Sequence, residues 1–199
     1  MTLMTRTLPH TPFWFLRHGE TDWNAQYRAQ GASDIALNAA GIAQAHRAAA
    51  VIAALPPERR PAHIVASPLS RARITAEVVG DALGLPVAID EALRECSFGI
   101  QEGQVMAEWF HAWVAGDDTP EGCEPFVDLR ARARGAIAAA LANPAPVLVV
   151  AHGALWRGFR AEAGLPADFR TPNAQPLWVT PPSPGDTAWS LAALAMPDA

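Results

Sequence analysis

The sequence predicts an α/β protein of three layers, in which a mostly parallel central sheet lies between helices. Short apolar runs alternate with longer amphipathic segments along the chain, as expected when helices connect parallel strands. Gly and Pro residues stand at the ends of these segments and mark the turns between them. The 199 residues, half of them apolar, suit a single domain over residues 1–199 with a full hydrophobic core.

The first half of the chain supplies three of the expected strands. A buried strand is predicted at 13–16, and Asn38 is the N-cap of a helix that extends to about Leu55. A second strand is expected at 63–66, followed by a helix over 70–83 that ends at Gly84. The third strand is a short one at 87–89.

The second half begins with a long amphipathic helix. Its apolar face is predicted from the spacing of Phe126, Leu129, Ala133, Ile137 and Leu141. A fourth strand follows at 147–151, and a further helix at about 154–163 ends at Gly164. The segments 177–180 and 187–194 flank a turn rich in Pro, Ser and Gly, which predicts a hairpin at the sheet edge.

The charged residues and the cysteines exclude several classes of protein. All 15 cationic residues are arginines, and a P-loop NTPase, a protein kinase, a Schiff-base enzyme or a pyridoxal phosphate enzyme needs a lysine. Cys96 and Cys123 are too few for a four-thiolate zinc site or a disulfide framework, and they suit a reducing cytoplasm. The net charge of −5 argues against nucleic acid or an anionic membrane as a partner. No apolar segment predicts an export signal or a spanning helix, so we expect a soluble cytoplasmic protein.

Polar residues that suit an anion follow three of the predicted strands. The carboxyl ends of parallel strands meet at one edge of a sheet, where ligands bind. Arginine presents planar, charged donors to phosphate oxygens, and a helix that begins after a strand adds free N–H groups. The candidates at these strand ends are Arg17, His18, Arg71, His152 and Gly153. The sequence therefore predicts a compact anion site in an acidic protein.

Four motifs, in one order, resemble those of the histidine phosphatase superfamily, also called phosphoglycerate mutase-like. LRHGET at 16–21 is similar to its nucleophile motif, and SPLSRARITA at 67–76 to its second-arginine motif. LRECSFGIQEG at 93–103 resembles its acid segment, and VVAHGALWRG at 149–158 its second-histidine motif. The resemblance covers nearly the whole chain and implies a phosphoglycerate mutase-like fold with a small inserted lid at about 96–126.

The resemblance also implies roles for the site residues. Neutral His18 would attack phosphorus and form a phosphohistidine, while Arg17, Arg71 and His152 would hold the phosphoryl oxygens. Glu95 would protonate the leaving oxygen and then deprotonate the attacking water. Arginines take the place of a metal cation, so no metal and no cofactor is expected. Further contacts with the substrate are expected from Asn24, Arg28, Gly31 and Gly153.

The predicted lid bears on the choice between a hydrolase and a mutase. It contains no arginine, and its carboxylates are Glu102, Glu108, Asp117, Asp118, Glu121 and Glu124. An acidic lid repels a second phosphate or carboxylate, whereas phosphoglycerate mutases carry basic residues in the corresponding insert, so the resemblance implies a phosphatase. Trp109 and Trp113 lie one helical turn apart and fit either an apolar wall for a leaving group or a helix face packed on the core.

We therefore expect a metal-independent phosphomonoester hydrolase that acts on a small phosphorylated metabolite. One alternative is a phosphoglycerate mutase-type phosphomutase, which needs a second anion site and a lid that retains the product. Another is a non-catalytic phospholigand-binding module, against which the presence of His18, Arg71 and Glu95 argues. The physiological substrate and the oligomeric state stay open at this point.

Overall fold

A six-stranded sheet forms the centre of the protein, with the strand order β3-β2-β4-β1-β5-β6. The computed structural model describes residues 8–183 and 185–196. The strands are β1 (Phe13–Arg17), β2 (His63–Ala66), β3 (Val87–Ile89), β4 (Val147–Ala151), β5 (Pro176–Thr180) and β6 (Ser190–Ala193). The first four are parallel, whereas β5 pairs antiparallel with β1 and β6 pairs antiparallel with β5. The predicted edge hairpin is therefore present.

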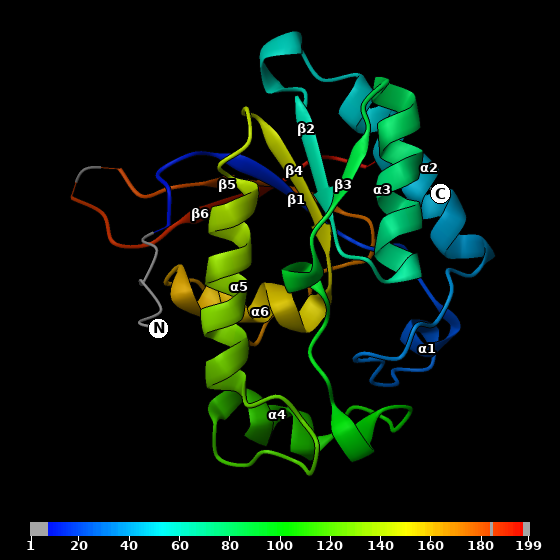
Figure 1. Cartoon of the computed structure of the whole chain (residues 1–199), viewed down its shortest axis with the longest axis vertical. Coiled ribbons are helices and arrows are strands. Elements are labelled where there is room, and N and C mark those ends of the chain that lie inside the picture. The colour runs from blue at the N-terminus through cyan, green and yellow to red at the C-terminus, as the bar shows by residue number, and fades with distance from the viewer. Residues whose placement is uncertain (1–7, 184, 197–199) are drawn as a thin grey trace.

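Helices cover both faces of this sheet (Figure 1). On one face α2 (Ala39–Ala53) packs with α3 (Ser70–Leu83), and on the other α5 (Phe126–Ala140) packs with α6 (Gly153–Glu162). The remaining α-helices of the described residues are α1 (Asp22–Ala25), after β1, and α4 (Glu108–Ala115), in the predicted lid. No helix in the described part of the chain has the length and apolar character needed to cross a membrane. The three layers and the mostly parallel sheet confirm the predicted fold class.

The local signals in the sequence set most element boundaries. The Asn38 side chain accepts a hydrogen bond from the N–H of Gly41 at 2.8 Å and so begins α2, and Gly84, with a φ of 67°, ends α3. The sequence did not predict α1, because a helix of one turn shows no periodic pattern. It begins instead with a reciprocal capping box between Thr21 and Asn24.

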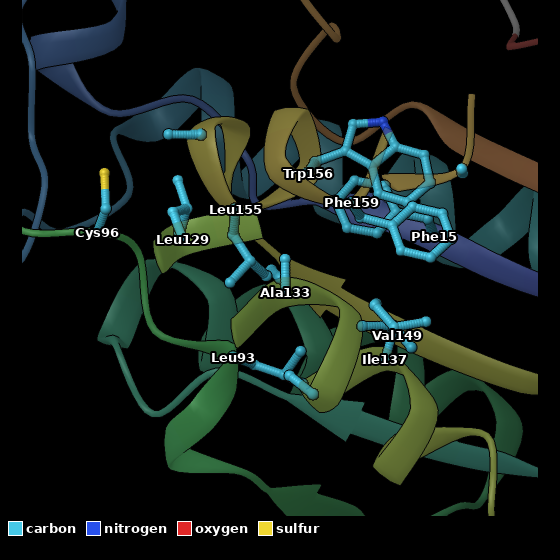
Figure 2. Close-up of a cluster of buried hydrophobic side chains, with 14 of the residues drawn as sticks. Phe15, Leu93, Cys96, Leu129, Ala133, Ile137, Val149, Leu155, Trp156 and Phe159 are labelled. Atoms are coloured by element: carbon cyan, nitrogen blue, oxygen red, sulfur yellow. The ribbon is translucent and has the colours of Figure 1, made fainter. Parts of the chain in front are cut away.

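Strand β1 is buried on both faces and carries the start of the site. Its alternate side chains pack into two hydrophobic clusters, Trp14 and Leu16 toward α2 and α3, Phe13 and Phe15 toward α5 and α6. Figure 2 shows the ring of Phe15 beside those of Trp156 and Phe159. The Phe15 and Trp156 rings are stacked with their centroids 3.8 Å apart. This packing fixes the end of β1, where Arg17 is the last residue of the strand and His18 follows it.

Candidate active site

A pocket opens where β1, β2 and β4 end, and it brings together most of the residues predicted from the sequence. Its lining includes Arg17, His18, Asn24, Arg28, Gly31, Arg71, Glu95 and Gly153. His152 is not part of the lining, but its ring centroid lies 5.3 Å from that of His18. Residues that are far apart in the sequence, such as His18 and Gly153, thus meet at one site because the strands that precede them end at the same edge of the sheet.

The imidazole of His18 is buried and held in one tautomer. Its Nδ1 lies 2.7 Å from the carbonyl oxygen of Gly19, and because a carbonyl only accepts, Nδ1 carries the proton and Nε2 keeps its lone pair. Burial lowers the pKa of His18 well below 6.5, and the guanidinium groups of Arg71 and Arg17 add to this effect. At neutral pH the ring is therefore uncharged, as a nitrogen nucleophile must be.

The backbone around His18 is fixed from three directions. The N–H of His18 donates to Ala151 on β4 at 3.0 Å, and the N–H of Gly19 donates to the hydroxyl of Thr75 on α3 at 3.0 Å. The amide of Asn173 donates to the carbonyl oxygen of His18 at 2.9 Å and to Oδ1 of Asn24 at 3.1 Å. These bonds leave the imidazole little freedom to move.

Two buried arginines flank the pocket with unused donors. Arg17 donates through Nη1 to Thr171 O at 2.7 Å. Arg71 donates to Ser33 O and to Gly31 O, both at 2.8 Å. In each, the buried Nε–H has no acceptor among the described residues. Burial is also the main cause that lowers the pKa of Arg17, to about 10, so the group stays charged at neutral pH. An anionic ligand would stabilise these buried cations, because it supplies both the opposite charge and the missing hydrogen-bond acceptors.

His152 lies next to His18 and is neutral at neutral pH. Its Nε2 is 2.6 Å from the hydroxyl of Ser67, which follows β2, and its buried Nδ1 has no partner among the described residues. Burial lowers the pKa of His152 well below 6.5, and Arg71 and His18 contribute to the shift. The side chain therefore keeps one ring nitrogen without a hydrogen-bond partner in the described structure.

The carboxylate of Glu95 contacts the start of α6. Its oxygens accept hydrogen bonds from the N–H groups of Ala154 at 2.9 Å and Leu155 at 2.8 Å. The expectation that these N–H groups are free for phosphate is therefore wrong. The reason is that a carboxylate reaching a helix N-terminus satisfies donors that have no partner within the helix. The helix instead fixes Glu95 at the pocket, and the donors that stay unsatisfied there are those of Arg17 and Arg71.

Residues 13–180 match the family model of the histidine phosphatase superfamily (branch 1). The chain belongs to this superfamily. A probable phosphoglycerate mutase of Erwinia tasmaniensis is 36% identical over 168 residues, 78% of this chain and 76% of that protein. The structure of a mycobacterial glucosyl-3-phosphoglycerate phosphatase with VO3 has a TM-score of 0.76 and 32% identity, covering 90% of this chain and 96% of that one. Phosphoryl transfer is therefore the chemistry that the family supports.

The carboxylates of the predicted lid, residues 96–126, do not face the pocket in the way that its composition suggests. Glu124 is paired with Arg132 at 2.6 Å. Glu102 accepts hydrogen bonds from the N–H groups of Ala32, Ser33 and Phe98, at 2.9, 3.0 and 3.2 Å. Of the six lid carboxylates, none lines the pocket as the structure describes it. Repulsion of a second anion by the lid is thus a weaker argument for a phosphatase than it was from the sequence.

The lid tryptophans do not form the pocket wall. Trp113 is fully buried, packs edge-on against Phe98 at 5.2 Å between ring centroids, and donates to Glu124 O at 2.9 Å. For Trp113, the interpretation as part of a helix face packed on the core is therefore confirmed, and the alternative of a pocket wall is wrong. The apolar wall is made by Phe98, Met106 and Phe110.

Several pocket residues were not predicted, because a motif or helix that contains a residue does not by itself tell whether the side chain faces the pocket. They are Ala29, Gln30, Phe98, Met106, Phe110, Ala154, Arg157, Arg170 and Thr171. Arg157 stands within the VVAHGALWRG segment, where its cationic charge five residues after His152 was the available signal. In the ranges 8–183 and 185–196, no group of three or more His, Cys, Asp or Glu side chains is placed to hold a metal ion.

Acidification below about pH 6.5 is expected to lower the free energy of unfolding. His18 and His152 resist protonation in the folded protein and take up protons when it unfolds. Their stabilising effect is fully present above about pH 6.5, the unfolded value, and is lost as the pH falls toward the folded pKa values. Each group contributes a slope of about 1.4 kcal/mol per pH unit in that window. Urea unfolding at pH 7.5 and pH 5.5 measures the resulting difference in the free energy of unfolding.

The matched pair for this measurement is His152→Gln and His46→Gln. His46 is exposed on α2, so its replacement should leave the difference between the two pH values unchanged. His152→Gln should reduce that difference. The explanation fails if His152→Gln retains the full pH dependence of the parent protein.

Glu102→Gln is expected to lower the free energy of unfolding by about 1 kcal/mol, because at least one of the exposed or partly buried donors that this carboxylate satisfies loses its acceptor. An amide keeps one acceptor oxygen, whereas three backbone N–H groups and the Ser33 hydroxyl donate to this carboxylate. Urea denaturation checks the change, with Glu121→Gln in the same lid as the control because Glu121 is exposed. Equal stability of the two variants would contradict the role assigned to Glu102.

Proposed function

We propose that this protein is a phosphomonoester hydrolase that works through a phosphohistidine on His18 and requires no metal ion. The observation that carries the proposal is the state of His18, which is neutral, has its Nδ1 bonded to Gly19 O, and lies by two buried arginines with unused Nε–H donors. A neutral nucleophile beside fixed positive charge is what phosphoryl transfer needs.

In the first step Nε2 of His18 forms a bond to phosphorus as the bond from phosphorus to the leaving oxygen breaks. Arg17 and Arg71 hold the phosphoryl oxygens and stabilise their charge, since their donors are already oriented. Glu95 gives a proton to the leaving oxygen. In the second step Glu95 takes a proton from a water molecule, whose oxygen bonds to phosphorus as the bond from phosphorus to Nε2 of His18 breaks. Inorganic phosphate leaves, and both His18 and Glu95 return to their starting states.

Hydrolysis is favoured over mutase activity by the match to the mycobacterial phosphatase, which covers 96% of that chain. The second candidate is a phosphomutase, and the observation in its favour is the 36% identity to probable phosphoglycerate mutases. The two reactions share the first step and differ in whether water or a second hydroxyl receives the phosphoryl group.

Steady-state hydrolysis of a panel of phosphomonoesters, with and without a chelator, tests the proposal. Mutase activity dependent on 2,3-bisphosphoglycerate is assayed in parallel. Phosphate release that persists in chelator supports the hydrolase. Mutase turnover with negligible hydrolysis supports the second candidate, and inactivity in both assays supports the non-catalytic binding module.

A further inference from the structure

The pocket contains more positive charge than one phosphoryl group requires. Five arginines line it, Arg17, Arg28, Arg71, Arg157 and Arg170, and Glu95 is the single carboxylate of the lining. Arg17 and Arg71 carry the unused buried donors of the anion site described above. The other three come from outside the lid, so the absence of arginine from the lid does not make the pocket mouth neutral.

Arg170 is held at this mouth by an aromatic ring. It follows α6, is exposed, and its guanidinium carbon lies 4.6 Å from the ring centroid of Tyr27. No acceptor in the described part of the chain is hydrogen bonded to it. Its charge also lies close to the anion site, because Arg170 is the neighbour that lowers the pKa of Arg17 most after burial itself.

Tyr27 has an unusual backbone that presents its ring to Arg170. Its φ is 56°, in the left-handed region that side chains other than glycine seldom adopt, and the residue is 58% exposed. Its N–H donates to Asn24 O at 3.2 Å, and its carbonyl accepts from the N–H of Met106 at 2.9 Å. A strained residue with an exposed aromatic ring at a pocket mouth is typical of a functional position.

Arg157 also lines the pocket and is fixed in a similar way. Its guanidinium carbon lies 5.2 Å from the ring centroid of Phe110, and Nη1 donates to Ala167 O at 2.6 Å. Stacking on a ring leaves the N–H groups along the guanidinium edge available for a ligand. Arg28 differs, because both its Nε and its Nη1 are bonded, to Gln26 at 2.9 Å and to Gly103 O at 2.7 Å.

We propose that Arg157 and Arg170 form a second anion subsite, so that the ligand carries a carboxylate or a further phosphate on the side of its leaving group. Tyr27 is the positioning residue for Arg170. The inference rests on the proposed function only in placing a phosphoryl group at Arg17 and Arg71. It is compatible with a hydrolase whose product keeps the second anion.

Binding of phosphonates tests the subsite independently of turnover, because the carbon–phosphorus bond is not hydrolysed. Calorimetry on the wild-type protein compares alkylphosphonates with phosphonoalkanoates of the same chain length, over two to four methylenes. Alkyl diphosphonates of the same lengths form the second arm. At least one length of one dianionic series should bind about tenfold or more tightly than its neutral-ended counterpart, and the better series identifies the second group as carboxylate or phosphate.

Arg170→Gln should reduce this ratio of affinities to less than about threefold, and Arg157→Gln should reduce it as well. Arg59→Gln is the matched control, because Arg59 also stacks on an aromatic ring, 4.9 Å from the centroid of Trp178, but does not line the pocket. Tyr27→Leu should lower the ratio by a smaller factor. Arg170 is exposed, so its variant should fold even where Arg157→Gln does not.

Two results would overturn the subsite. One is a wild-type ratio below threefold at every chain length, and the other is an Arg170→Gln protein that weakens both ligand series equally. Failure of the proposed function has a different signature. In that case no phosphomonoester is hydrolysed, while the phosphonate ratio and its dependence on Arg170 are retained.

Discussion

His18→Ala is expected to reduce turnover of every phosphomonoester by about 10⁴-fold or more, the usual scale for loss of a covalent nucleophile. His18 is the one histidine among the described residues that line the pocket, and its Nδ1 is bonded to Gly19 O, which leaves Nε2 with its lone pair. Arg17 and Arg71 would still bind the phosphoryl group, so affinity for phosphate should change far less than the rate. Single-turnover measurements on the wild-type protein should show an acid-labile phosphoryl group that the variant lacks.

The control for this experiment is His46→Ala, an exposed histidine on α2, which should keep full activity. The circular dichroism spectrum of His18→Ala should match that of the parent, because the core below β1 does not involve the imidazole. A folded His18→Ala protein that keeps more than about 1% of the parent turnover would exclude His18 as the nucleophile, because a lost nucleophile leaves far less activity.

Glu95→Gln is expected to slow phosphoryl transfer from alkyl phosphates by about 10³-fold and from p-nitrophenyl phosphate by less than about tenfold. General acid catalysis contributes about 10²–10⁴-fold, and a good leaving group needs little protonation. The readout is the rate of the first step in single-turnover experiments, since hydrolysis of the intermediate also uses Glu95.

A purely structural role for Glu95 predicts a different result. Its carboxylate caps α6 through Ala154 and Leu155, and disturbing that cap would slow both substrates by the same factor. Equal losses would therefore remove the general acid role. Thermal unfolding of the variant measures how much the lost cap contributes, and Glu121→Gln again serves as a control with an exposed carboxylate.

The fold and the anion site were predictable because their signals are local. Apolar runs marked the parallel strands, and residues that directly follow a strand in the sequence also follow it in space. Arg17, His18, Arg71 and His152 were therefore expected together at the carboxyl edge of the sheet, and the motif resemblance added Glu95. Helix ends at Asn38 and Gly84 were equally visible, because capping uses one residue type at one position.

The remaining features depend on contacts between loops, for which the sequence has no periodic signal. Asn173 reaches the carbonyl oxygen of His18 across a separation of 155 residues, and nothing around it marks that role. The stack of Arg170 on Tyr27 likewise joins two loops. The hydrogen bonds from α6 to Glu95 were missed for the same reason. The sequence at the start of a helix is the same whether its free N–H groups bind an external anion or a carboxylate of the chain itself.

The position of β1 in the sheet also affects the order of events during synthesis. β1 pairs with β4 and β5, both made in the last third of the chain, so it leaves the ribosome with no partner strand. Its apolar side chains lack these partner strands until β4 emerges, and unpaired apolar strands of this kind are prone to aggregation in a partly folded chain. His18 lies at the end of this strand and its N–H bonds to Ala151. His18 can therefore reach its place in the site only after most of the polypeptide has been made.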